Sequence, residues 1–251
     1  GGWPYAKTTN ETLWYRKGAT IMNFFEVIFG NGRWIYLWHG FEVTIVLTTI
    51  SVLSGLILGL ILALMRTSIS QPFIFLGRKC KNQKNKIISA IANFNPLQAF
   101  AKLYISLIRG TPVLVQLLIM YYVVFGSMRT MPKLFVAAIA FAMNSAAYIA
   151  EIIRGGIESV DKGQLEAARS LGFSHTKSMI YVVLPQALKS SMPGLIGEGI
   201  AMFKETSIVG WIGLSDIMRG ADDIRSLTAT AFQSLVAAAI IYLAITAIFY
   251  K

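Results

Sequence analysis

The stretch D-K-G-Q-L-E-A-A-R-S-L-G-F-S-H-T-K-S-M-I-Y-V-V-L-P, residues 161–185, is the longest polar interruption in the apolar C-terminal half of the chain. Asp161 and Gln164, three positions apart, form a capping-box pattern, which predicts the start of a short helix. Gly172 can end that helix in the left-handed conformation, and Ser174 can cap a second helix. We therefore expect two short helices joined by a turn, outside the hydrocarbon of a membrane.

The first of these helices has leucine and alanine on one face, with Leu165, Ala168 and Leu171 in line. Small side chains on that face let a foreign surface approach the helix backbone closely. A helix of two turns buries too little of its own surface to be stable alone, so the pattern predicts that it docks into a partner. The residues expected to take part in docking are Gln164, Glu166, Ala167, Ala168, Leu171 and Gly172.

The composition is that of a polytopic membrane protein. Hydrophobic residues make up 55% of the 251 positions and charged residues 14%, whereas soluble domains have about 25% charged residues. The net charge of +11 does not indicate nucleic-acid binding, because residues 43–150 contain no Asp or Glu and most of their Lys and Arg fall in one loop. Positive charge beside membrane spans is typical of the cytoplasmic side. We therefore expect an all-α protein that contacts lipid and no nucleic acid.

Apolar runs of about 20 residues, the length that crosses a bilayer, recur along the chain. After an extracellular or interfacial segment at 1–40, we predict a transmembrane domain at 41–250 with five spans, at 41–65, 103–125, 134–153, 193–212 and 228–250. The aromatic run at 20–38 favours a helix lying in the interface, with a packed soluble subdomain as the alternative. The G-x-x-x-G pattern of Gly55 and Gly59 permits a close helix contact, which a dimer could use.

Basic residues predict the topology. The loop after the first span holds Cys80 and is rich in Lys and Arg, and the run at 87–103, broken by Pro96, is expected to lead inward from the interface. With five spans, this loop lies on the same side of the membrane as the polar loop at 154–190, which contains the docking helix and is also basic. The positive-inside rule then places both loops in the cytoplasm, with the N-terminus outside and the C-terminus cytoplasmic.

Polar residues interrupt three of the predicted spans. Arg109, Thr111 and Pro112 mark a structural break in the second span, because Pro112 removes a backbone donor. Ionisable residues within spans are costly and tend to be functional. We predict a substrate path that includes Glu151, Glu198, Lys204, Glu205, Thr206 and Ser207. For Glu151 an ion pair with Arg154 that braces the helix end is an equal alternative, and Glu198 is interpreted as a contact for a substrate ammonium group.

The sequence contains no pattern for covalent chemistry. There is no G-x-x-x-x-G-K-[ST] to hold ATP phosphates, no H-E-x-x-H, and no pair of aspartates within the spans. The single cysteine excludes a disulfide framework. We therefore expect a chain that is not an enzyme and binds no metal or cofactor of its own.

Several motifs together resemble one family. They are E-A-A at 166–168 followed by Gly172 and Leu184-Pro185, R-G-T-P at 109–112, N-S-A-A-Y-I-A-E-I-I-R-G-G-I at 144–157, L-P-Q-A at 184–187 and K-E-T-S at 204–207. The chain resembles, over roughly residues 40–250, the membrane-spanning permease subunits of ABC importers, in the branch that takes up polar amino acids. The quoted stretch is then the cytoplasmic EAA coupling-helix loop of a type I importer fold.

The resemblance implies partners as well as a fold. It implies a second permease chain, the same or homologous, an ABC ATPase subunit that binds ATP and Mg²⁺ beneath each docking loop, and an extracellular or periplasmic substrate-binding protein. The function it implies is ATP-driven import of a polar amino acid by alternating access. The family element K-D-T-S-L is K-E-T-S-I here, and Gly197 and Gly199 stand where Asn and Phe are expected, which leaves the local pocket shape open.

Two other classes stay open on the residues alone. One is an ATP-independent secondary transporter of amino acids, although the chain lacks the internal repeat that many such carriers have. The other is a membrane scaffold, which leaves Glu198, Lys204 and Glu205 without a role. Glutamine, glutamate, histidine, arginine, cystine and an opine remain candidate solutes, with a cationic one favoured by Glu198.

Overall fold

The computed structural model describes residues 23–67, 95–128 and 130–249, and in these residues every regular element is a helix. The elements are α2 (Phe24–Phe29), η1 (Gly30–Gly32), α3 (Trp34–Thr67), α6 (Pro96–Arg109), α7 (Val113–Ile119), η2 (Met120–Val124), α8 (Lys133–Ser159), α9 (Lys162–Ser170), α10 (His175–Ser178), η3 (Met179–Val183), α11 (Leu184–Glu205), η4 (Thr206–Ile212), α12 (Ile217–Thr228) and α13 (Ala231–Phe249). The predicted all-α class is confirmed. Residues 1–22, the basic loop with Cys80 and the start of the run at 87–103 lie outside the described residues.

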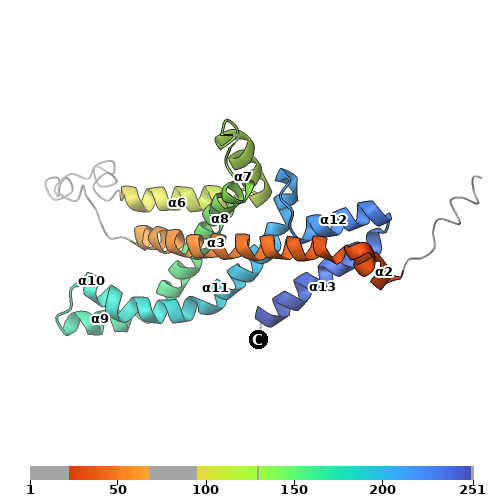
Figure 1. Ribbon diagram of the computed structural model, residues 1–251. Coiled ribbons are helices and arrows are strands. Elements are labelled where there is room, and N and C mark those ends of the chain that lie inside the picture. The colour runs from red at the N-terminus through yellow and green to blue at the C-terminus, as the bar shows by residue number, and fades with distance from the viewer. Residues whose placement is uncertain (1–22, 68–94, 129, 250–251) are drawn as a thin grey trace, which may run out of the picture.

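Helices α3 and α8 cross in close contact at the centre of the bundle (Figure 1). Two glycines of α3 permit this contact. A Cβ atom at Gly59 would lie 2.6 Å from the side chain of Ile149, and one at Gly55 would lie 2.9 Å from that of Ser145. The G-x-x-x-G pattern therefore packs α3 on α8 of the same chain, and this side of α3 is not a free dimer face.

The second predicted span is bent at its middle. Helices α6 and α7 are separated by a break of a few residues and meet at an angle of 103°. The break at Pro112 is confirmed, whereas the single span predicted at 103–125 is not. Its start is also corrected: Pro96 does not interrupt a run but begins α6, where its missing N–H removes no hydrogen bond, and the Asn95 side chain caps the helix by accepting from Gln98 N at 3.1 Å.

The predicted count of five spans is not confirmed. Among the described residues, three helices are long and apolar enough to cross a membrane: α3, α8 and α13. The bent pair α6 and α7 brings the number to four if it counts as one span. The predicted span at 193–212 coincides with the second half of α11 and with η4, and it is not among these helices.

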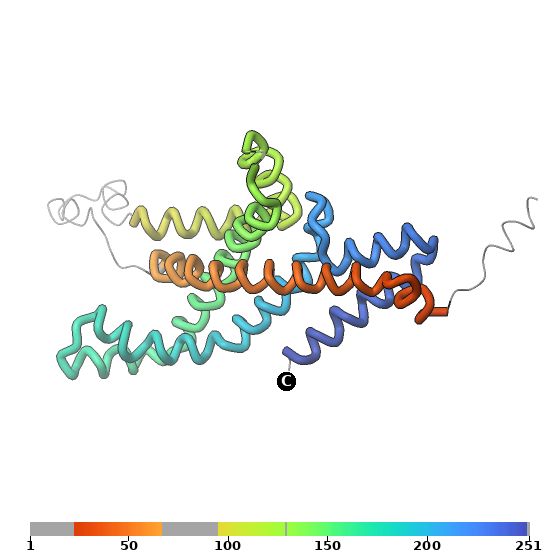
Figure 2. The backbone as a smooth tube through the Cα atoms, in the orientation of Figure 1, coloured from red at the N-terminus to blue at the C-terminus, as the bar shows by residue number. Residues whose placement is uncertain are grey.

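The two ends of the bundle differ in what they contain. The tube in Figure 2 shows the last turn of α3, the first turn of α6 and the α9–α10 turn toward one end, and α2, the last turn of α12 and the start of α13 toward the other. The last turn of α3 and the α9–α10 turn thus lie toward the same end of the bundle.

The segment between the last two predicted spans contains a helix, α12. It packs against the first half of α3 through a glycine on each helix, because a Cβ at Gly220 would lie 2.5 Å from the Tyr36 carbonyl oxygen and one at Gly40 would overlap the Asp216 carbonyl. Asp216 is fully buried and caps α12, accepting from Met218 N at 3.1 Å and Arg219 N at 3.0 Å. This end of the bundle is therefore closely packed.

Helix α3 begins at Trp34, six residues before the predicted boundary at residue 40. The aromatic run at 20–38 is also not one interfacial helix. It divides into the short α2, the turn η1 and the first residues of α3. The turn holds Asn31 and Gly32 at positive φ, and Arg33 donates to the Val27 carbonyl at 2.7 Å and to that of Glu26 at 2.5 Å. The aromatic side chains thus belong partly to the end of a span, where amphipathic rings are common.

Candidate functional site

The predicted docking turn has the predicted local structure. Asp161 caps α9 by accepting from Gly163 N at 2.6 Å, and Ser174 caps α10 by accepting from Lys177 N at 3.3 Å. Between them Gly172 has φ +87°, a conformation that costs side-chain-bearing residues about 1–2 kcal/mol. The cap of α9 differs in detail from the expected capping box, because the Asp161 side chain bonds Gly163 and its carbonyl oxygen accepts from Gln164 N at 3.0 Å.

The residues predicted for docking divide into two groups by exposure. Gln164, Glu166, Ala167 and Gly172 are exposed, and Leu171 is 80% exposed. Ala168 is only 4% exposed, because α9 packs on α10 and η3. The exposed members form an outer surface on the turn, and Ala168 faces into the turn and supports it.

The docking turn is continuous with the helix that carries the predicted path residues. Elements α10, η3 and α11 follow one another without an intervening loop from His175 to Glu205. The π-helical η3 ends two residues before Pro185, and the Leu184 N–H that follows it donates to the Met179 carbonyl. Such single π turns are frequent at functional sites. Glu198, Lys204 and Glu205 therefore lie on the same helical run as the turn.

The break in the second span is stabilised by a glutamine that sequence reasoning missed. The Gln116 amide nitrogen donates to the Ile108 carbonyl at 2.7 Å and to the Thr111 hydroxyl at 2.8 Å. Its oxygen accepts from Asn144 Nδ2 at 3.0 Å, which connects α7 to α8. A carbonyl freed by Pro112 thus has a partner, as a membrane interior requires. Only the position of Gln116 four residues after the proline could have suggested this role.

Glu151 lies at the centre of an arginine cluster. Its carboxylate accepts from Arg154 at 3.0 Å, pairs with Arg66 of α3, and lies 3.7 Å from the Arg109 guanidinium at the end of α6. Arg154 also pairs with Glu158 at 2.5 Å. The predicted Glu151–Arg154 pair is confirmed, and it is one part of a larger cluster that joins α3, α6 and α8. The prediction that Glu151 lines a substrate path stays a prediction.

Glu198 is buried where α11 meets α8. The Ser145 hydroxyl donates to Glu198 Oε1 at 2.9 Å, and 9% of the residue is exposed. A Cβ atom added at Gly197 or Gly199 would meet nothing within 4 Å. The two glycine positions that flank Glu198 on α11 are therefore not packed against another element.

The four residues at 204–207 lie further along α11 and at the start of η4. Thr206 is buried and donates to the Phe203 carbonyl at 2.8 Å, which satisfies a backbone acceptor where α11 ends. Lys204 and Ser207 line a cavity of about 400 Å³ together with Tyr242 of α13. Glu205 is half-buried. The predicted path residues thus form two groups, one along α8 and one between η4 and α13.

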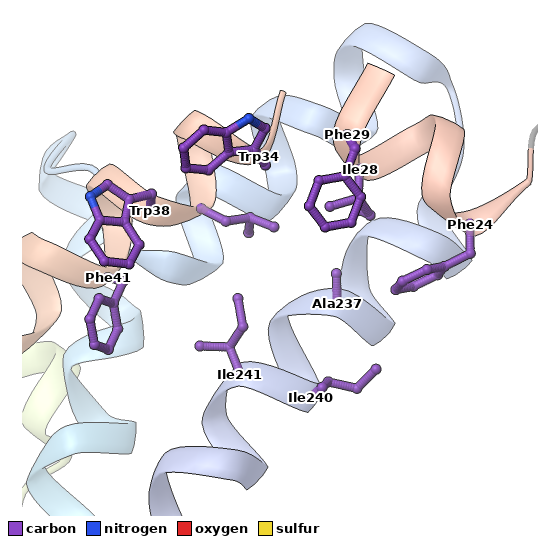
Figure 3. A pocket seen from close by; sticks show the side chains of 10 residues that line it. Phe24, Ile28, Phe29, Trp34, Trp38, Phe41, Ala237, Ile240 and Ile241 are labelled. Carbon is purple, nitrogen blue, oxygen red and sulfur yellow. The ribbon is translucent and has the colours of Figure 1, made fainter. Parts of the chain in front are cut away.

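A second cavity of about 400 Å³ lies at the α2 end of the bundle (Figure 3). Figure 3 shows aromatic and aliphatic side chains from α2, α3 and α13 around it, among them Trp34, Trp38 and Ile241. The side chains of the described residues that line it are all apolar or aromatic. Within the described ranges, no group of three or more His, Cys, Asp or Glu side chains could hold a metal ion.

A bundle of apolar helices with buried carboxylates and an exposed turn at one end defines an integral membrane protein of the transporter class. Residues 87–250 match the family model described as binding-protein-dependent transport system inner membrane component. The chain belongs to this family of membrane transport components.

The chain is also similar to individual proteins over most of its length. It is 36% identical to the arginine transport system permease protein ArtQ of Bacillus subtilis, with 82% of this chain and 84% of that protein covered. It is 33% identical to the glutamate/aspartate import permease protein GltK of Escherichia coli O6:H1, with 84% and 87% covered.

The chain is also similar in fold to solved structures of transporters. A chain from the crystal structure of an amino acid ABC transporter with histidines has a TM-score of 0.71 and 40% identity, with 86% of this chain and 90% of that chain covered. The MetNI methionine ABC transporter in an inward-facing conformation has a TM-score of 0.66 at 15% identity, with 88% and 94% covered, which supports the fold alone.

Proposed function

We propose that this chain is the permease subunit of an ATP-driven importer that moves a polar amino acid across the cytoplasmic membrane by alternating access. The observation that carries the proposal is the exposed turn at Ala167 and Leu171, continuous with the helix that bears Glu198. The relatives named above, which are permeases for arginine and for glutamate and aspartate, support a polar amino acid as the solute.

The partners belong to the same proposal. An ABC ATPase subunit, which binds ATP and Mg²⁺, receives the docking turn. A second permease chain, the same or homologous, completes the path, and a substrate-binding protein delivers the solute from outside. The chain itself hydrolyses no ATP. Its N-terminus lies outside and its C-terminus in the cytoplasm.

Each group of residues has a task in this mechanism. Gln164, Glu166, Ala167, Leu171 and Gly172 contact the ATPase, and Ala168 supports them from inside the turn. Closure of the ATPase subunits on ATP moves the turn and the helix attached to it. Glu198 binds the ammonium group of the solute, because it is a buried carboxylate on the helix that continues from the docking turn. Lys204, Glu205, Thr206 and Ser207 line a further part of the path.

The test is uptake of labelled amino acids by vesicles that contain the complete importer with its ATPase and binding protein. Uptake that requires ATP inside supports the proposal, and uptake driven by an ion gradient without ATP would establish a secondary transporter instead. Ala167→Trp should abolish uptake while the protein still inserts into membranes, because a bulky side chain on an exposed turn blocks docking without disturbing the bundle. Ala167→Ser keeps a small side chain and should retain uptake.

A further inference from the structure

Arg109 holds an unusual position in the charge pattern of the bundle. It lies at the last residue of α6, directly before the break, and its side chain is 43% exposed. Its closest carboxylate oxygen, on Glu151, is 3.7 Å away, which is beyond hydrogen-bonding distance. Among the described residues its N–H groups donate no hydrogen bond to another side chain. The Arg109 guanidinium is thus attracted to Glu151, while its N–H groups remain available to donate hydrogen bonds to a ligand.

The carboxylate beside Arg109 does not neutralise it. Glu151 is also bonded to Arg66 and Arg154, and Glu158 is the other acidic partner in the cluster. Three arginines and two glutamates leave one positive charge in excess. Arg109 has the loosest ion pair of the three arginines, so the excess charge is most available on its guanidinium.

A second carboxylate, that of Glu198, is buried against the same helix, α8. Ser145, Tyr148 and Glu151 follow one another at three-residue intervals on α8, so they are neighbours along one side of that helix. Ser145 holds the Glu198 carboxylate, and Tyr148 lies under Arg109, with 5.2 Å between the guanidinium carbon and the ring centroid. Arg109 is within electrostatic range of Glu198, yet the two form no ion pair. The residues of α8 that Arg109 and Glu198 contact are thus three positions apart, so the two opposite charges lie along one side of this helix and match the two charges of an α-amino acid.

We propose that Arg109 binds the α-carboxylate of the solute while Glu198 binds its ammonium group, so that the path recognises the zwitterionic head common to amino acids. This inference rests on the proposed function, because it assigns the solute charges to residues of that path. A guanidinium suits the role, since its planar fork of N–H donors matches a carboxylate. The side chain of the solute is then left to groups on other elements or on the second permease chain.

The test measures equilibrium binding to the purified permease–ATPase assembly in detergent, without binding protein or ATP. Labelled L-histidine, L-arginine, L-glutamine and L-glutamate serve as probes. Each is compared with its decarboxylated amine: histamine, agmatine, 4-aminobutanamide and 4-aminobutanoate. In the wild-type assembly the amino acid should bind at least about tenfold more tightly than the amine, as expected for loss of one charge-assisted interaction. Arg109→Gln should bring this ratio close to one, and Arg109→Lys should restore part of it.

Controls separate this role from a structural one. Arg225→Gln removes an arginine of α12 that pairs with Asp222 outside this cluster, so it should leave the ratio at the wild-type value. An unchanged ratio in Arg109→Gln, an equal loss of affinity for amino acid and amine, or failure of every probe to bind would each overturn the assignment. Failure of the proposed function would appear separately, as absence of ATP-dependent uptake by wild-type vesicles, whatever the binding ratio.

Discussion

Arg66, in the last turn of α3, donates a hydrogen bond to the carboxylate of Glu151 on α8, a residue 85 positions later in the chain. The same carboxylate holds Arg154 of its own helix and attracts Arg109 of α6. Three helices that are distant in sequence thus depend on one acidic side chain, which is only 15% exposed.

Replacing that acid should therefore destabilise the bundle. In Glu151→Gln the arginines lose their shared counter-charge and repel one another, at a cost of about 2 kcal/mol, between the values for exposed and buried pairs. The melting temperature of the detergent-purified protein should fall by roughly 4–8 °C. Glu158→Gln is the matched control, because Glu158 is 64% exposed, and it should shift the melting temperature little. Equal shifts in the two variants would contradict this account of the cluster.

Two adjacent glycines of α8 should respond differently to alanine. A Cβ at Gly156 would overlap the Ser191 hydroxyl and lie 2.6 Å from the Ala187 carbonyl, whereas one at Gly155 would meet nothing within 4 Å. Gly156→Ala should force α8 and α11 apart and cost about 1–3 kcal/mol. Gly155→Ala should be neutral or stabilise the helix by up to about 1 kcal/mol. Thermal unfolding of both variants checks this, and a Gly156→Ala protein as stable as Gly155→Ala would show that the helices do not meet here.

The break between α6 and α7 should depend on Gln116. Gln116→Leu removes the donor to the Ile108 carbonyl and the acceptor for Asn144, leaving polar groups unpaired at a cost of about 1–3 kcal/mol. Gln186 provides a control, because its exposed side chain bonds mainly its own helix, and Gln186→Leu should change little. The measurement is the melting temperature together with amide hydrogen exchange at residues 108–116. Unchanged exchange in Gln116→Leu would argue against the bridge.

Asp216 should give the α12 end a pH-dependent stability. Burial raises the pKa of its carboxyl above the ordinary value of 3.8, against the opposing effect of the hydrogen bonds from Arg219 and Met218. The folded protein then holds this proton more tightly than the unfolded chain, so stability falls as pH rises through the window above 3.8 and returns on acidification. Asp216→Asn keeps an oxygen for the cap but cannot titrate. Melting curves from about pH 4 to 8 should show wild type losing stability relative to the variant, and parallel curves would disprove it.

The docking turn could be predicted from sequence because its structure is local. Asp161, Gly172 and Ser174 act on backbone groups within a few residues of themselves, and their side chains alone decide where α9 ends and α10 begins. The break at Pro112 was predictable for the same reason. The apolar runs likewise indicated the membrane class and the approximate positions of α3, α8 and α13.

Features that depend on contacts between distant segments could not be predicted. The length of the runs did not reveal the 103° bend between α6 and α7, because the angle depends on how Gln116 and Asn144 meet across helices. Helix α12 forms between two predicted spans and was not predicted, because it depends on packing against the distant α3. Arg109 was expected only to mark a break, and its place beside Glu151 follows from the fold.

The uninterrupted helix from His175 to Glu205 has a geometric consequence. At 1.5 Å per residue it is roughly 45 Å long, so a rotation of about 10° at one end carries the other end about 8 Å sideways, more than the width of an amino acid. A small rotation imposed at the docking turn would therefore displace the Lys204 end of this helix by a much larger distance. In the proposed mechanism the helix acts as a lever arm. Its stiffness around Pro185 and Pro193 determines how much of that displacement reaches the Lys204 end.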